Sequence, residues 1–130
     1  MSYFPDSVSF EPMNPTIKAQ WLEALRSGEY KQGREYLRQS NKDTVLHCCL
    51  GVLCDLHRKA TGTYQWEVPC SEFSVYSYCG LKSCLSSEVS DWAKIRSGTM
   101  LDNTADDVLA TANDNGADFP TIANWIEANL

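Results

Sequence analysis

The sequence lacks the long apolar run that a membrane-spanning helix needs. No stretch approaches the roughly 20 consecutive apolar residues that cross a bilayer. Its first residues, Met1 to Asp6, also lack the basic start and the apolar stretch of a secretory signal. We therefore expect no membrane contact, and a protein that stays in the cytoplasm of the cell that makes it.

Basic residues are also scarce, with 11 Lys and Arg against 17 Asp and Glu and a formal net charge of -6. Proteins that bind duplex nucleic acid normally carry a basic surplus, because neutralising phosphates supplies most of their affinity. We therefore expect no duplex nucleic acid among the partners. The cations are nevertheless concentrated, since Lys31, Arg34, Arg38 and Lys42 lie close together with Glu35 as the only acid between them.

Recognisable catalytic motifs, internal repeats and low-complexity tracts are absent too. Gly28 and Gly33 have the spacing of a phosphate-binding loop, but no Lys-Ser or Lys-Thr pair follows them. The turn from Asp114 to Asp118 is too short for a calcium loop and lacks the final glutamate of such loops. The sequence therefore predicts no catalytic residues, no bound metal and no cofactor.

Six cysteines stand out against these absences: Cys48, Cys49, Cys54, Cys70, Cys79 and Cys84. In a reducing cytosol we expect free thiols, since a buried cysteine behaves as a small apolar residue. Zinc binding is an alternative, with Cys49, Cys54 and His57, or Cys79 and Cys84, as ligands. The C-x4-C spacing of both pairs lies at the loose limit of structural zinc sites. Disulfide bonds are a further alternative.

A thiol enzyme is the remaining hypothesis for these cysteines. Cys48 or Cys49 would act as the nucleophile at the start of a helix, where the helix dipole lowers the pKa of a thiol. His47 and His57 are the only imidazoles that can serve as a base. Because adjacent side chains usually point apart, His47 is poorly placed for Cys48, and core packing explains the pair more simply.

Hydrophobic periodicity predicts a first helix over residues 15–27, with Asn14 as its N-cap and Gly28 as its stop. The segment that follows is polar, then contains turn residues, and ends in a β-branched apolar stretch. This pattern predicts a β-hairpin over about residues 31–47.

A second helix is predicted over about residues 48–60, closed by Gly62, because this segment is almost wholly apolar. Gly51 lies inside this helix, where glycine costs about 1 kcal/mol relative to alanine. Either another backbone packs closely against Gly51, or the helix begins after it. Further strands are predicted at 64–68 and 73–78.

Three short helices are predicted in the last third, behind the N-cap residues Ser86, Thr104 and Asp118. The pair Thr104 and Asp107 has the spacing of a capping box, and Ser97 with Gly98 is expected to end the first of these helices. The elements together predict one α+β domain, in which a small antiparallel sheet packs against about four to five short helices. We assign it the whole chain, residues 1–130, with an irregular segment at 1–13.

One segment combines two glycines, two cations, an amide and an aromatic residue within residues 27–34. Glycine lets backbone N–H groups approach an anion closely, cationic side chains neutralise phosphate, and an aromatic ring stacks on a base. A solvated basic hairpin with turn glycines is the plain alternative. The sequence predicts a binding site for a small phosphate-bearing ligand at Tyr30, Lys31, Gln32, Gly33, Arg34 and Arg38.

Five aromatic residues crowd a second segment: Tyr64, Trp66, Phe73, Tyr76 and Tyr78. If these rings are exposed they form a docking patch for another protein, since Tyr and Trp are enriched at interface hot spots. If they are buried they form the core face of the sheet. Both interpretations stay open at the level of sequence, and so does self-association into a homo-oligomer.

Several strings of the sequence are distinctive: SGEYKQG at 27–33, CCLGVLCDL at 48–56 and NDNGADF at 113–119. In these strings the chain resembles a group of small uncharacterised proteins from tailed bacteriophages and prophages, over roughly residues 17–127. The resemblance implies no catalytic residues. It implies a phage accessory protein that acts in the cytoplasm of an infected bacterium.

We therefore expect a non-enzymatic binding protein that antagonises a host or defence process by sequestering a nucleotide signal. A protein-binding inhibitor or a phage assembly component is the alternative, and a cysteine-based enzyme is a further one. These expectations about function rest on the resemblance and on the basic segment around Lys31.

Overall fold

The computed structural model describes residues 3–4, 10–41, 43–68, 75–95 and 104–130. Within them the chain forms five helices and four short strands, which confirms the predicted α+β class. In chain order the elements are α1 (Pro15–Ser27), β1 (Lys31–Gln32), β2 (Arg38–Asn41), β3 (Thr44–His47), α2 (Cys49–Thr61), β4 (Val75–Tyr76), α3 (Ser87–Ala93), α4 (Ala105–Asp114) and α5 (Phe119–Asn129).

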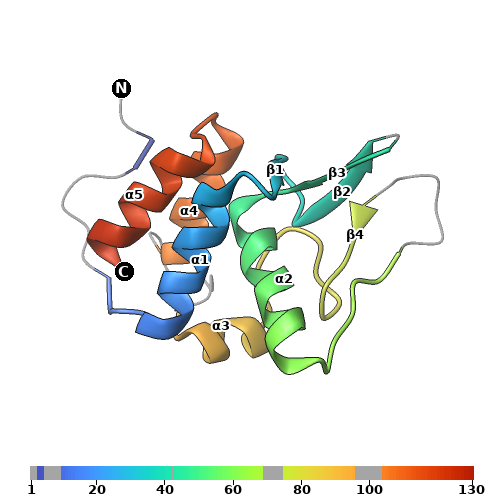
Figure 1. The fold of residues 1–130 in the computed structure, drawn as a ribbon, viewed down its shortest axis with the longest axis horizontal. Helices are drawn as coiled ribbons and strands as arrows, with labels where there is room; N and C mark the ends of the chain where they lie inside the picture. The colour runs from blue at the N-terminus through green and yellow to red at the C-terminus, as the bar shows by residue number, and fades with distance from the viewer. Residues whose placement is uncertain (1–2, 5–9, 42, 69–74, 96–103) are drawn as a thin grey trace.

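Helix α2 lies between the other long helices and the sheet (Figure 1). On one side α2 packs against α1 and α4, and α1 in turn packs along α5. On the other side the start of α2 contacts β3. Helix α3 also packs against α2, away from the sheet (Figure 1). No helix among the described residues combines the length and the apolar character that crossing a bilayer demands.

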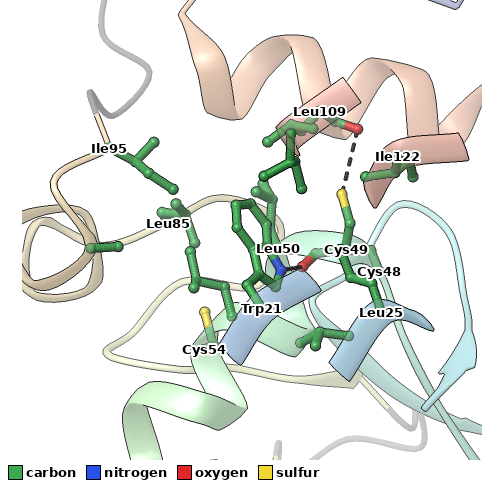
Figure 2. Packing of buried hydrophobic residues seen from close by; sticks show 14 of the residues in the cluster. Trp21, Leu25, Cys48, Cys49, Leu50, Cys54, Leu85, Ile95, Leu109 and Ile122 are labelled. Carbon is green, nitrogen blue, oxygen red and sulfur yellow. Dashed lines mark hydrogen bonds between the residues drawn. The ribbon is translucent and has the colours of Figure 1, made fainter. Parts of the chain in front are cut away.

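Helix α1 has the bounds that its local signals predicted. The side chain of Asn14 accepts hydrogen bonds from the backbone N–H groups of Thr16 and Ile17, at 3.0 and 3.2 Å. Gly28 ends the helix in the left-handed conformation, with φ of 82°. Trp21 is fully buried, and its ring N–H donates to the backbone carbonyl of Cys49 at 3.0 Å (Figure 2).

Helix α2 confirms the first of the two explanations for Gly51. The helix begins at Cys49, so Gly51 lies in its first turn, and Gly62 ends it with φ of 66°. A Cβ atom at position 51 would lie 1.7 Å from the carbonyl oxygen of Leu37. The backbone before β2 therefore runs against the helix at a distance that only glycine allows.

The sheet has the strand order β1-β3-β2-β4 and is mixed rather than purely antiparallel. Strands β2 and β3 form the hairpin, which begins at Arg38 instead of about residue 31. Residues between β1 and β2 do not continue the hairpin, because Glu35 turns the chain with φ of 73°. Strand β1 consequently pairs parallel to β3, through Lys31 with Leu46 and Gln32 with His47.

The predicted strand at 64–68 is reduced to a single bridge between Glu67 and Ser77. The chain here follows α2 instead, with Tyr64 stacked on His57 and Trp66 hydrogen-bonded to Asp55. Of the predicted strand at 73–78, the structure contains β4 and the isolated bridges after it. Residues 73–74 lie outside the described part of the chain.

The three C-terminal helices form behind the predicted N-caps. Ser86 and Asp118 each accept a hydrogen bond from a backbone N–H in the first turn. Thr104 does not cap α4 in this way, because its hydroxyl donates to Asp107 at 2.8 Å. Helix α3 ends at Ala93, since Lys94 adopts a left-handed conformation with φ of 58°; the stop expected at 97–98 lies outside the described residues.

A buried asparagine ties the C-terminal helices to the sheet. Asn113 of α4 donates to the carbonyl of Gly33 at 2.8 Å and accepts from the backbone N–H of Cys49 at 3.2 Å. The side-chain amide of Gln32 donates to Asn113 at 2.9 Å and to the carbonyl of Ala117 at 2.7 Å. These bonds hold β1 in place from residues more than 60 positions away along the chain.

Candidate functional site

Three side chains form a row across one face of the sheet. Arg38 of β2 pairs directly with His47 of β3 on one side and with Tyr76 of β4 on the other. Directly paired residues of antiparallel strands project to the same face. The strand register thus places a cation, an imidazole and a phenol next to one another.

A surface pocket of about 340 Å³ lies beside this row. Strand β1 pairs only with Leu46 and His47, so Thr44 and Val45 have no strand neighbour on that side within the described chain. The pocket occupies this notch, and we refer to it as the β3 pocket. Its lining residues are Glu29, Tyr30, Lys31, Arg38, Asp43, Thr44, Val45 and His47.

Asp55 of α2 fixes the position of Tyr30 from behind. Asp55 is only 5% exposed, and its carboxylate accepts hydrogen bonds from Tyr30 at 2.6 Å, Trp66 at 3.0 Å and Arg58 at 2.9 Å. Lys59 lies 3.6 Å from the same carboxylate. Burial alone would raise the pKa of Asp55, but the three hydrogen bonds outweigh it and hold this pKa well below its usual range. Asp55 is therefore a carboxylate at any physiological pH.

His47 is the least satisfied polar side chain of this region. It is 7% exposed, and neither ring nitrogen has a hydrogen-bond partner among the described residues. The rings of Tyr30 and Trp66 pack edge-on against it, with centroids 5.0 and 5.8 Å away. Burial lowers its pKa from 6.5 to about 4, so the imidazole is neutral and offers one donor and one acceptor. Buried polar groups rarely stay unpaired, which makes His47 a candidate ligand contact.

Arg38 is held in place by aromatic rings. Its guanidinium carbon lies 4.5 Å from the ring centre of Tyr76 and 5.5 Å from that of Trp66. Its Nε atom is buried and has no hydrogen-bond partner within the described chain. A guanidinium stacked in this way is preorganised to bind an anion, because little side-chain entropy is lost on binding.

The structure brings together three of the six predicted ligand-binding residues. Tyr30, Lys31 and Arg38 line the β3 pocket. Gln32 instead bonds into the Asn113 network described above, and its side-chain oxygen accepts from the backbone N–H of Phe119 at 3.1 Å.

The other two predicted residues also lie away from the pocket. Gly33 is buried against Leu46, whose Cβ would be 2.8 Å from a Cβ at position 33. Arg34 is exposed, and its guanidinium lies near Gly116, in the turn between α4 and α5. Gly33 is thus a packing residue, and Arg34 belongs to a different surface.

Two residues of the site are not predicted from the sequence. The sequence suggests His47 only as a base for Cys48, and it predicts no role for Asp55. The signal for His47 is that it ends an apolar strand where an inward-facing residue is expected. Asp55 is an acid within an otherwise apolar helix, which is a sign of a buried polar network.

The aromatic segment faces the interior more than the solvent. Tyr78 is 1% exposed and hydrogen-bonds His57 at 2.7 Å, while Tyr64, Trp66 and Tyr76 are half-buried. Phe73 lies outside the described residues. A docking patch made of these rings therefore has little accessible ring surface in the described part of the chain.

The cysteines of α2 are buried thiols. Figure 2 shows Cys48, Cys49 and Cys54 among core side chains, with Cys49 donating to the carbonyl of Leu109 at 3.6 Å. Burial raises the pKa of Cys48 to about 11 and the pKa of Cys49 and Cys54 well above the usual thiol range. A protonated, inaccessible thiol is a poor nucleophile, so this geometry disfavours the cysteine-based enzyme.

The hypothetical zinc ligands are not gathered at one point. The described residues contain no group of three or more Cys, His, Asp or Glu side chains arranged to hold a metal ion. Cys84 is exposed and Cys79 is partly exposed, and burial raises the pKa of both thiols. Cys70 lies outside the described part of the chain.

Comparison with known proteins gives one match. The family described as Domain of unknown function (DUF8296) matches residues 13–130. No curated protein and no solved structure matches the chain. The matched region contains all five helices, the sheet and every residue of the β3 pocket. The chain therefore belongs to the DUF8296 family.

Proposed function

We propose that this protein is a non-enzymatic binding protein that sequesters a phosphate-bearing nucleotide in the β3 pocket. The observation that carries the proposal is the combination around this one cavity. Two cations, Lys31 and Arg38, lie beside the ring of Tyr30 and beside His47, whose ring nitrogens have no hydrogen-bond partner in the part of the chain that the structure describes. Cations suit a phosphate, and an aromatic ring with a free donor and acceptor suits a nucleobase.

The absence of reactive groups at the pocket supports binding rather than catalysis. The imidazole of His47 is neutral and has no carboxylate partner among the described residues, and the buried thiols of α2 are not among the lining residues. Asp55 is engaged by Tyr30, Arg58 and Trp66. None of these groups is arranged as a nucleophile with its base.

The biological part of the proposal follows from the resemblance to proteins of tailed phages. A phage protein that sequesters a nucleotide signal in the infected cell would antagonise a host or defence process without consuming the signal. A protein-binding inhibitor or an assembly component stays the alternative, and a stoichiometric partner recovered from host lysate would favour it.

The test is a thermal-shift and calorimetric screen of the full chain against cyclic and linear nucleotides. We expect at least one nucleotide to stabilise the wild type, and Lys31→Ala/Arg38→Ala to lose this stabilisation. Arg34→Ala is the matched control, because Arg34 belongs to the same basic segment but lies outside the pocket. Chromatography should recover the bound nucleotide unchanged.

Two results would contradict the proposal. The first is that no nucleotide stabilises the wild type. The second is that Arg34→Ala reduces binding as much as Lys31→Ala or Arg38→Ala does alone, because the effect would then come from net charge rather than from the pocket.

A further inference from the structure

The rim of the β3 pocket carries acids as well as cations. Glu29 and Asp43 line the same cavity as Lys31 and Arg38. His47 adds no charge near neutral pH, because burial lowers its pKa to about 4. Among the described lining residues the formal charges therefore cancel. A site built only to attract phosphate would not place two carboxylates on its rim.

The groups behind Tyr30 leave a single positive charge in excess. Asp55 pairs with both Arg58, at 2.9 Å, and Lys59, at 3.6 Å. The ammonium group of Lys59 also lies 5.5 Å from the ring centre of Tyr30, which lines the pocket. The charges of the described residues around the pocket thus sum to about one cation, which is weakly attractive to a singly charged anion.

The size of the cavity points to one nucleotide rather than two. Its volume of about 340 Å³ is at the lower end of the roughly 300–1,000 Å³ that is typical of small-molecule sites. The ligand must therefore be compact and must have a limited charge.

We infer that the ligand is a single nucleotide whose phosphate carries one negative charge, as in a cyclic phosphodiester, and that Glu29 and Asp43 select against nucleoside polyphosphates. This inference rests on the proposed function and specifies its ligand class. The phosphate lies near Lys31 and Arg38. Ribose hydroxyls or base amino groups donate to the two carboxylates, and the edge of the base reaches His47.

The pocket discriminates among nucleotides because a ligand with too many or too few negative charges leaves some charges in the complex unpaired. A nucleoside triphosphate brings several negative charges into a cavity that supplies one positive charge in excess, so the additional phosphates face Glu29 and Asp43 without compensation. A nucleoside without phosphate leaves Lys31 and Arg38 without a partner. Both should bind less tightly than the singly charged form.

The experiment compares a charge series on the full chain by isothermal titration calorimetry at low salt. The probes are nucleoside, 3′,5′-cyclic monophosphate, 5′-monophosphate and 5′-triphosphate, each with the adenine, guanine, cytosine and uracil base. We expect the cyclic monophosphate of the preferred base to bind tightest, and its triphosphate to bind at least about tenfold more weakly.

Neutralising the two acids should remove this selection. In Glu29→Gln/Asp43→Asn we expect the ratio of triphosphate to cyclic monophosphate affinity to rise about tenfold. Glu11→Gln/Asp91→Asn is the control, since both acids are exposed, lie outside the pocket and change the net charge by the same amount. All four substituted side chains are exposed, and unliganded melting curves will show whether each variant is folded.

The outcomes separate the inference from the proposal on which it rests. Failure of every probe to bind the wild type overturns both. The inference is overturned if a triphosphate binds tightest. It is also overturned if the ratio of triphosphate to cyclic monophosphate affinity changes equally in the two double variants. Either result leaves the proposal of nucleotide sequestration unaffected. Loss of triphosphate discrimination only in Glu29→Gln/Asp43→Asn supports it.

Discussion

Replacing His47 with phenylalanine should make the protein more resistant to mild acid. In the folded protein the pKa of His47 falls from 6.5 to about 4. Burial is the main cause, Arg38 and the two cations of α2 add to it, and Asp55 opposes it. In the unfolded chain the imidazole regains its ordinary pKa. As the pH falls through 6.5, His47 becomes protonated in the unfolded state but not in the folded state, so the free energy of unfolding decreases.

The size of this effect follows from the gap between the two pKa values. The difference between 6.5 and about 4 corresponds to about 3 kcal/mol of stability, which is present above the unfolded pKa and fully lost once the pH has fallen below the folded pKa. Roughly 2 kcal/mol of it should be lost between neutral pH and pH 5. His47 is only 7% exposed, so solvent screening reduces this figure little.

The assay is urea unfolding followed by circular dichroism at a series of pH values from neutral to mildly acidic. His47→Phe keeps an aromatic ring between Tyr30 and Trp66 and removes the titrating group. Asp55 and His57 are present in both proteins, so their contributions cancel in the comparison. The wild type should lose roughly 2 kcal/mol more than the variant by pH 5. Equal losses of unfolding free energy in the two proteins would contradict this prediction, because they would mean that His47 takes up a proton as readily in the folded protein as in the unfolded chain.

Three further perturbations test the surrounding structure. In thermal melts, Gly51→Ala should destabilise the protein by about 4 kcal/mol or more, because its Cβ would overlap a backbone carbonyl. Gly62→Ala should cost only about 1–2 kcal/mol in the same assay, because Gly62 has open space around it and only its φ of 66° is unfavourable for alanine. Asp55→Asn should cost about 3 kcal/mol in urea unfolding, since it breaks a buried charge pair, whereas exposed Asp91→Asn should change stability by less than about 0.5 kcal/mol. Iodoacetamide should label exposed Cys84 before the buried thiols of α2, and mass spectrometry should find those buried thiols modified only after denaturation. Rapid labelling of the α2 thiols in the native protein would contradict their burial.

The elements that sequence predicted well are those whose signals are local. Helix α1 follows from Asn14, the proline after it and Gly28, all within one segment. Helix α2 follows from an apolar run closed by Gly62. Capping and left-handed termination depend on neighbouring residues only, so the pattern contains the information.

The parallel placement of β1 could not be predicted, because it depends on contacts far along the chain. Gln32 and Gly33 are fixed by Asn113 and Ala117, about 80 residues later. The local composition around Lys31 pointed to a ligand, yet the same contacts turn Gln32 inward. The tertiary structure, and not the local sequence, decides whether a given residue of a basic segment faces a cavity.

The site shows the same division. Tyr30, Lys31 and Arg38 were predicted from their chemistry, and the structure gathers them at one cavity. The isolation of His47 depends on Trp66, which lies 19 positions away in sequence and covers one side of the imidazole. Periodicity reports that a residue is buried, but not which partners it lacks.

The asparagine that joins α4 to β1 also bears on the order in which the molecule is completed during synthesis. The segment that contributes Tyr30, Lys31 and Arg38 leaves the ribosome about 80 residues before Asn113 and Ala117, which hold β1 beside β3. Domains generally fold as units. A nascent or truncated chain that stops before α4 should therefore not complete the β3 pocket, because it lacks the contacts that hold β1 in place.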